Sequence, residues 1–395
     1  MTVSVIMYKN LELSNTEIAL YTSWLYLPWV IKPLWSPIVD LLKTKRWWIV
    51  SMELVLGAAL AGVALSLQTE FFFQYSLAFF WLIAFSSATH DISIDGFYMI
   101  ALSEKEQSFF VGIRSTFYRI AMITGQGLIV ILAGLFEEHL SDIKFAWTIT
   151  FFIIAAAFLL LFIYHTLIIP KPQNDRAVKY SENFLKGFTE TFISFFRKEN
   201  IVVILLFILF YRFGEGQLVK LAAPFLLDNF EAGGLELNTA SVGFIYGTAG
   251  VIALVLGGIL GGIVASKHGL KYWFWWMLIA INLPNVVYIF LAFLQPQNFI
   301  LIVSFVFIEQ FGYGFGFTAF MLYLIYVSEG NHKTSHFAIA TGLMALGMMI
   351  PGMISGWIQE MIGYKLFFVW ILISTIPAFI ISYFIKLDPE FGKKS

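Results

Sequence analysis

Two aspartates lie deep inside an apolar stretch of this sequence, in the run 71–102. Asp91 and Asp95 are four positions apart, so a helix would present both on one face. A carboxylate surrounded by apolar side chains is costly unless it is paired or protonated, and such groups are candidates for carrying protons. His90, directly before Asp91, is a third group that can take up a proton. We expect these three residues to couple protons to transport, with structural ion pairing as the alternative.

Two arginines follow at matching positions in the next apolar run. If Lys105 is the tip of a hairpin, Asp91 and Arg119 each lie 14 positions from it, and Asp95 and Arg114 lie 10 and 9 positions from it. Antiparallel neighbouring helices would therefore place Asp91 beside Arg119 and Asp95 beside Arg114. The second pair could equally be a structural salt bridge. Arg119 is a candidate contact for an anionic substrate.

The second half of the chain carries its own buried charges. Arg212 and Glu215 are three positions apart and could pair on one helix. Glu309 has no charged neighbour in the sequence, which makes it the stronger candidate for proton coupling, together with Glu215. Gln310 and Tyr313 follow it in a stretch rich in glycine, where backbone and rings could approach a polar ligand. We expect Arg212, Gln310 and Tyr313 to contact substrate.

Further side chains could bind substrate or shape the helices around it. The rings of Tyr118 and Tyr211, like that of Tyr313, could stack on a sugar. Lys32 is a candidate substrate contact, although its stem could also extend to the membrane surface. The remaining candidates lie at helix bends and short loops, and we expect structural or gating roles for them: Asp40, Arg46, Arg114, Pro33 and Pro37.

These residues must be positioned by transmembrane helices. Hydrophobic residues make up 59% of the 395 positions and charged residues 12%, against roughly 25% charged residues in a soluble domain. A membrane span needs about 20 mostly apolar residues. Eleven runs meet this requirement: 16–38, 47–68, 71–102, 107–135, 143–169, 201–228, 238–266, 271–294, 299–328, 335–362 and 364–386. We therefore expect an all-α polytopic membrane protein.

Lysine and arginine gather in alternate loops, which predicts the orientation of the chain. The loops around 43–46, 105, 267–271 and 333, the segment 170–200 and the C-terminal tail carry these residues, so we expect this side to be cytoplasmic. Phenylalanines at helical spacing in 181–198 predict an amphipathic helix. The expected domains are an N-terminal bundle (1–169), a cytoplasmic linker (170–200) and a C-terminal bundle (201–395).

Five spans precede the linker and six follow it, whereas duplicated transporters have equal halves. We expect residues 1–8 to be the remnant of a first helix whose earlier part is missing. Because the sequence has no cysteine and no HExxH, Walker or GxSxG motif, we expect no metal, no cofactor and no enzymatic activity. A net charge of −1 gives no reason to expect nucleic acid. The expected partners are the bilayer, protons and a small molecule, bound by a monomer.

Three segments resemble the AmpG muropeptide permease family of major facilitator transporters. Residues 27–40, with their Leu-Pro, Lys and Leu-Trp-Ser-Pro run ending in Asp, are similar to the end of that family's second helix. Residues 88–97 (ATHDISIDGF) are similar to its fourth helix, although His90 replaces the usual Gln and Gly96 the usual Ala. Residues 211–215 (YRFGE) resemble the opening of its seventh helix.

The resemblance implies a major facilitator fold of two six-helix bundles and a proton-driven importer in the bacterial inner membrane. It implies cell-wall fragments built on N-acetylglucosaminyl-anhydromuramic acid as substrates. It also implies that helices one, four, seven and ten line the cavity, with Asp91, Asp95, Arg212, Glu215 and Glu309 there. Two alternatives stay open: a carrier of another organic anion such as an acyl-coenzyme A, and a membrane-embedded enzyme or non-transporting receptor.

Overall fold

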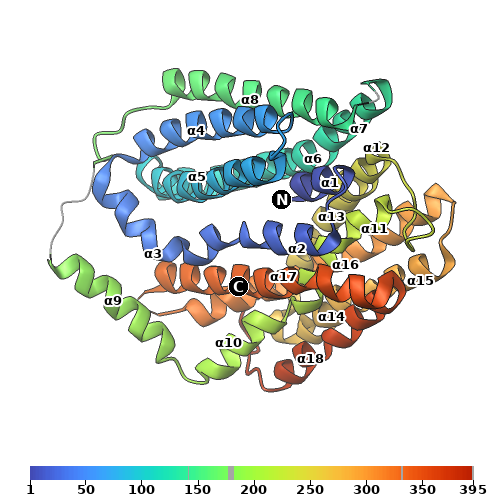
Figure 1. Cartoon of the computed structure of the whole chain (residues 1–395). Coiled ribbons are helices and arrows are strands. Elements are labelled where there is room, and N and C mark those ends of the chain that lie inside the picture. Colours follow the sequence, from blue (N-terminus) through green and yellow to red (C-terminus); the bar gives the residue numbers. More distant parts are fainter. Residues whose placement is uncertain (141, 177–181, 331, 394–395) are drawn as a thin grey trace. The chain divides into compact units, whose positions relative to one another are not determined.

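A computed structural model describes residues 1–140, 142–176, 182–330 and 332–393, and every regular element in those ranges is a helix (Figure 1). The chain divides into two compact units. Unit 1 comprises Met1–Trp24, Ala121–Ile131 and Glu190–Ser395, and unit 2 comprises Leu25–Ile120 and Leu132–Thr189. The units follow packing rather than chain order, and the division into bundles at 170–200 stays a prediction.

Most of the predicted spans are helices of membrane length. Within the described ranges, nine helical segments are long and apolar enough to cross a membrane. Eight correspond to single predicted spans, and the ninth, Lys333–Tyr383, covers the last two, which meet near Gly363 with its φ of +73°. The predicted single helix over 16–38 is wrong. It breaks after Trp24, because Pro28 has no N–H to bond back to the Trp24 carbonyl.

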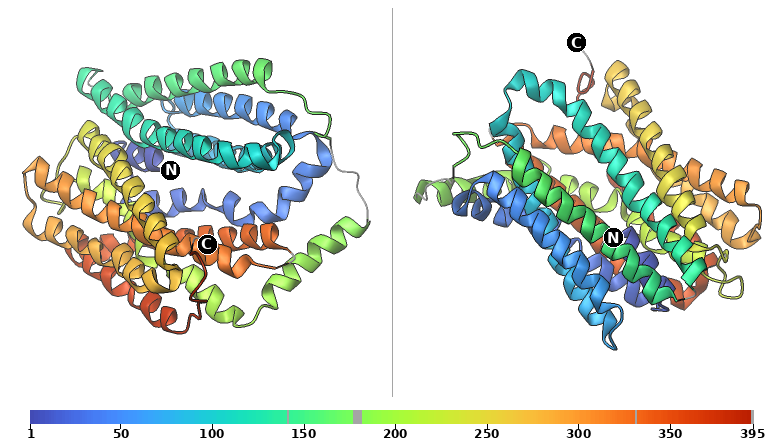
Figure 2. Two further views of the ribbon diagram at one scale, coloured as in Figure 1. Left: turned by 180° about the vertical axis from the view of Figure 1, so that it is seen from behind. Right: turned by 90° about the horizontal axis from the view of Figure 1, so that it is seen from above.

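Unit 2 is built around three long helices. Helix α4 (Lys45–Ser66) packs on α5 (Phe72–Ala101) and on α8 (Ile143–Ile168), and the three run side by side in Figures 1 and 2. Side-chain oxygens of Thr44 and Asp142 cap the first turns of α4 and α8. Helix α3 (Leu27–Leu42) contacts α5. Helices α6 (Glu104–Ile123) and α7 (Ile129–Leu140) contribute residues to both units, and the π-helical turn η1 (Thr124–Leu128) between them belongs to unit 1.

Unit 1 holds the two N-terminal helices, α1 (Thr2–Asn10) and α2 (Asn15–Trp24), and the C-terminal half of the chain. A helix is present where one is predicted over 181–198: α9 (Glu182–Phe196), whose residues from Glu190 onward belong to this unit and whose Phe195 is fully buried. Its role as an amphipathic linker helix stays a prediction. Phe207, Tyr211, Phe320 and Tyr323 form an aromatic core in this unit. Further helical elements follow α9 in the described chain. They are α10 (Ile201–Phe210), α11 (Phe213–Leu227), α12 (Thr239–Val242), η2 (Gly243–Gly250), α13 (Val251–His268), α14 (Leu270–Asn282), η3 (Leu283–Asn285), α15 (Val286–Leu294), α16 (Phe299–Ser328), α17 (Lys333–Ser374) and α18 (Ile376–Tyr383).

Glycines allow helices in unit 1 to approach until their backbones touch. A Cβ at Gly247 of η2 would lie 2.0 Å from the backbone oxygen of Gln126 in η1. A Cβ at Gly356 of α17 would lie 2.0 Å from the backbone oxygen of Asn15 in α2. Such distances are far below van der Waals contact, so only glycine fits at these crossings.

Candidate functional site

A group of buried ionisable residues lies within unit 1. Glu309 on α16 is 1% exposed, Glu215 on α11 is 3% exposed and Arg212 is 9% exposed. Oε2 of Glu309 accepts a 3.0 Å hydrogen bond from the side-chain amide of Gln310. Among the described residues, neither Oε1 of Glu309 nor Oε2 of Glu215 has a hydrogen-bond partner. Two carboxyl groups thus lie in this interior with hydrogen-bonding capacity to spare.

A break in a transmembrane segment positions Arg212. It lies between α10 and α11, at φ −113° and ψ 22°, close enough to Glu215 to interact electrostatically. Its guanidinium carbon is 5.2 Å from the ring centre of Tyr313 and 4.8 Å from that of Phe317, and Nη2 donates to the Tyr313 hydroxyl. Nε has no hydrogen-bond partner within the described part of the chain. The rings hold the cation, and the free N–H can bind an anion.

Two tyrosines surround Glu309 from other helices. Tyr246 on η2 and Tyr288 on α15 are buried and interact electrostatically with Glu309 and Glu215. The hydroxyl of Tyr288 lies beside the Glu309 carboxyl but outside hydrogen-bonding geometry. With both carboxyls ionised, these groups would hold two negative charges against one positive charge on Arg212. The one excess negative charge is costly in a buried site. Binding of one proton to either carboxylate removes this charge and makes the group neutral. We call Arg212, Glu215, Tyr246, Tyr288, Glu309, Gln310 and Tyr313 together the Glu309 cluster.

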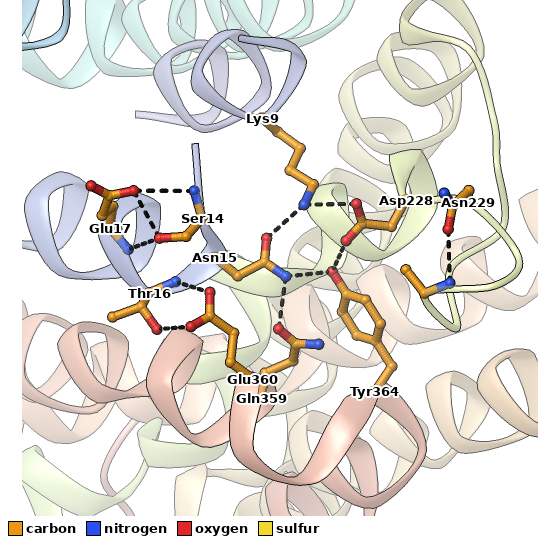
Figure 3. Close-up of polar contacts among 11 residues, drawn as sticks. Lys9, Ser14, Asn15, Thr16, Glu17, Asp228, Asn229, Gln359, Glu360 and Tyr364 are labelled. Carbon is orange, nitrogen blue, oxygen red and sulfur yellow. Dashed lines mark hydrogen bonds and ion pairs between the residues drawn. The ribbon is translucent and has the colours of Figure 1, made fainter. Parts of the chain in front are cut away.

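A second polar network in unit 1 ties the N-terminal helices to α11 and α17 (Figure 3). Nζ of Lys9 lies 2.7 Å from Oδ1 of Asp228 and donates to Asn15 at 3.0 Å. Asn15 donates to Gln359 and to the hydroxyl of Tyr364, which donates to Asp228 at 2.7 Å. These side chains satisfy one another, so this network fixes the turn after α1 against the end of α11 and the kink of α17 near Gly363.

Lys220 is a further buried charge, 2% exposed, in the middle of α11. Its Nζ donates a 2.9 Å hydrogen bond to the hydroxyl of Thr22 on α2. A charged side chain buried in an apolar interior needs such partners. The contact adds a polar link between α11 and α2, within the same unit as the Glu309 cluster.

Unit 2 places the predicted aspartates in ion pairs. Arg114 donates to Asp95, as the hairpin spacing predicts. The predicted partner of Asp91 is wrong: its Oδ2 lies 2.5 Å from Nζ of Lys32 on α3. Arg119 makes no ion pair with any described residue. Helix α3 packs on α5, and this tertiary contact brings Lys32 to Asp91.

The other candidates occupy varied environments. Tyr211 is fully buried, stacks on Phe320 and donates to the carbonyl of Gly316, which is a packing environment. The side chain of Tyr118 is 67% exposed. Arg46 donates to the carbonyls of Thr166 and Ile169, so it joins the start of α4 to the end of α8. Pro33 and Pro37 lie inside α3. The side chain of Asp40 lies outside the described part of the chain.

Sequence reasoning missed three buried or paired groups. From the sequence Glu53 is expected to be only a solvated side chain, but it is 4% exposed and contacts His165. Lys9 and Asp228 form their pair across more than 200 positions of sequence, which no local spacing can indicate. Glu53 lies eight positions into the apolar segment that begins at Lys45. This position inside an apolar segment was the one feature of the sequence that could have indicated a buried carboxylate.

The membrane-length helices and the family match given next define the class of the chain, a multi-pass membrane transporter rather than an enzyme. Residues 1–329 match the model of the Major Facilitator Superfamily, and the chain belongs to that family. The chain is similar in structure to the nucleoside transporter NupG, with TM-score 0.70, 16% identity and 98% and 94% of the two chains covered. It is also similar to a bacterial homologue of the human lysosomal transporter Spinster, inward-facing and occupied, with TM-score 0.69, 17% identity and 98% and 95% covered.

Two curated relatives point to a narrower group. The chain is 26% identical to the anhydromuropeptide permease of Escherichia coli K12 over 359 residues, which covers 89% of this chain and 69% of the relative. It is 27% identical to a transporter named AmpG 4 from Rickettsia conorii over 390 residues, with 94% and 90% covered. These likenesses confirm the AmpG-like resemblance of the sequence.

Proposed function

We propose that this chain is a proton-coupled importer of cell-wall-derived muropeptides or anhydro-muramyl sugars, working by alternating access in a bacterial inner membrane with its C-terminus in the cytoplasm. The names of its relatives support the substrate class. The distribution of lysine and arginine among the loops supports the orientation. The observation that carries the proposal is the Glu309 cluster, in which one arginine shares a buried interior with two carboxyl groups.

Charge balance links protons to substrate in this proposal. Binding of one proton neutralises the Glu309 cluster, because Arg212 compensates only one of the two carboxylates. The muramyl carboxylate brings a negative charge, and the available Nε–H of Arg212 is a suitable donor for it. If Arg212 turns from Glu215 to the substrate, Glu215 is left without its cation and favours the protonated form. Substrate and proton therefore stabilise each other's binding.

Aromatic rings beside Arg212 supply the remaining contacts. Tyr313 and Phe317 flank the guanidinium, and such faces pack well on sugar rings. The amide of Gln310 holds Oε2 of Glu309 and adds a polar group to the same wall of α16. Tyr211 is turned into the core and does not belong to this surface.

The test is uptake of radiolabelled GlcNAc-anhydroMurNAc by proteoliposomes, with and without an inward proton gradient. The wild-type chain should accumulate the sugar only with the gradient. Glu309→Gln, which fixes a neutral side chain, should lose gradient-driven accumulation but keep exchange of labelled for unlabelled sugar. Glu231→Gln changes an exposed loop carboxylate and is the matched control. If Glu309→Gln accumulates sugar like the wild type, the proposed proton site is wrong.

A competition arm separates the substrate classes. Excess unlabelled anhydro-muramyl sugar should abolish uptake of the label, whereas acetyl-coenzyme A should leave it unchanged. No uptake of the sugar together with saturable uptake of an acyl-coenzyme A would move the chain to that class of organic anion carrier.

A further inference from the structure

A carboxylate and two histidines from three helices meet inside unit 2. Glu53 on α4 has a side chain that is 6% exposed. Its Oε1 lies 2.6 Å from Nδ1 of His165 on α8 and 3.4 Å from Nε2 of His90 on α5. Oε2 of Glu53 has no hydrogen-bond partner among the described residues. Oε1 of Glu53 is thus a buried oxygen that contacts two imidazole rings, and all three side chains can bind protons.

The short contact is a hydrogen bond, and the Nδ1–H of a neutral His165 ring can supply its proton. At 2.6 Å, Glu53 and His165 are joined by a hydrogen bond, because two lone pairs at that separation would repel each other. The same distance leaves no space for an ion between the atoms. Within the described residues no group of three or more histidine, aspartate or glutamate side chains is arranged to hold a metal. A further proton can bind at Oε2 of Glu53 or at Nε2 of His90, which have no hydrogen-bond partner among the described residues, without disturbing this contact.

The charged groups around Glu53 do not neutralise it. Helix α4 packs against α3, α5 and α8. Lys32 on α3 is engaged by Asp91, and Asp95 on α5 is engaged by Arg114. Arg46, at the start of α4, donates to the backbone carbonyls at the end of α8. The two histidines are thus the only cation-forming groups in contact with this carboxylate in the described part of unit 2.

We propose that Glu53, His90 and His165 form a proton-binding site in unit 2, separate from the Glu309 cluster. With both rings neutral and Glu53 ionised, the site holds one uncompensated negative charge in an apolar interior, which is costly. One bound proton makes it neutral and keeps the short hydrogen bond. The site lies about 12 Å along α4 from Lys45, at 1.5 Å per residue.

The exposed fraction of the side chain differs among the three residues of the site. The side chain of His165 is 31% exposed, that of Glu53 6% and that of His90 19%. His90 is followed by Asp91, which is paired with Lys32 on the neighbouring helix. The hydrogen bond gives a proton a direct path between His165 and Glu53, and a charge change at His90 acts on the adjacent ion pair. A role in transport rests on the proposed function above, whereas proton binding itself does not.

The test uses nuclear magnetic resonance of the full-length chain in micelles with ¹⁵N-labelled histidine, from about pH 8 to about pH 5. Ring nitrogen shifts distinguish neutral from protonated imidazole, and His165→Gln and His90→Gln assign the signals. Glu53→Gln should lower the ratio of protonated to neutral ring at His165 at the same pH, because the substitution removes the carboxylate that Nδ1 contacts. Glu231→Gln, on an exposed loop, should leave the ratio unchanged.

Two outcomes would overturn the site. One is an unchanged His165 ratio in Glu53→Gln protein whose melting temperature matches the wild type. If Glu53→Gln does not fold, His165→Gln serves as the test instead. The protonated fraction of His90 should then rise, since Glu53 has lost its nearer partner. An unchanged protonated fraction of His90 would contradict the site. No substrate is needed, so failure here leaves the uptake result intact, and failed uptake leaves the proton site intact.

Discussion

The close crossing of η1 and η2 in unit 1 makes a sharp prediction for Gly247→Ala. The added Cβ would lie 2.0 Å from the oxygen and 2.2 Å from the carbon of the Gln126 carbonyl. Ordinary contact begins at 3.4 Å, so the η1 and η2 backbones must separate by about 1.4 Å, and neither has a flexible side chain end that can yield. Overpacking of this kind costs about 1–3 kcal/mol. The gain from replacing glycine in a helix, about 1 kcal/mol, offsets only part of that cost.

The matched control is Gly262→Ala on α13, where a new Cβ meets nothing within 4 Å. Both variants make the same chemical change in a membrane helix, so their difference reports the crossing alone. Unfolding in mixed micelles with increasing sodium dodecyl sulfate should show Gly247→Ala less stable than Gly262→Ala by about 1–3 kcal/mol. Equal midpoints for both variants would refute the close-packing argument for this crossing.

Three further substitutions test other contacts. Lys9→Met leaves Asp228 without its cation and should lower unfolding stability by about 1–3 kcal/mol in the same micelle titration; an unchanged midpoint would contradict the network in Figure 3. Asp91→Asn breaks a partly exposed pair with Lys32 and should cost only about 0.2–1 kcal/mol, so a loss of several kcal/mol would mean that the pair is more deeply embedded than its 46% exposure indicates. Arg212→Lys keeps the charge but loses the planar contact with two rings and the Nε–H, so sugar affinity should fall about tenfold or more; wild-type affinity by equilibrium binding would remove Arg212 from the substrate site.

Composition and apolar length predicted the helical membrane fold because the bilayer imposes a strong local rule. Ten of the eleven spans needed only an apolar run of adequate length. The run 16–38 also satisfies that rule, but Pro28 breaks its hydrogen-bond ladder. Proline is tolerated in many membrane helices, so its presence alone could not decide between a bend and a break.

Partners within one hairpin were predictable, whereas partners from distant helices were not. Asp95 and Arg114 occupy matching depths in consecutive helices, and they pair. Asp91 satisfies the same arithmetic with Arg119, yet packing of α3 on α5 offers Lys32 instead. Glu309 was recognisable as a buried charge from its surroundings in the sequence. Its neighbours Tyr246 and Tyr288 come from other helices, and only the tertiary structure brings them to it.

Proton movement driven by substrate tests the central claim most directly. Proteoliposomes holding the wild-type chain and a trapped pH-sensitive dye would receive external GlcNAc-anhydroMurNAc at equal pH on both sides. The account predicts acidification of the interior as the sugar enters, and none with Glu309→Gln. Entry of radiolabelled sugar through the wild-type chain with no change in internal pH would contradict it.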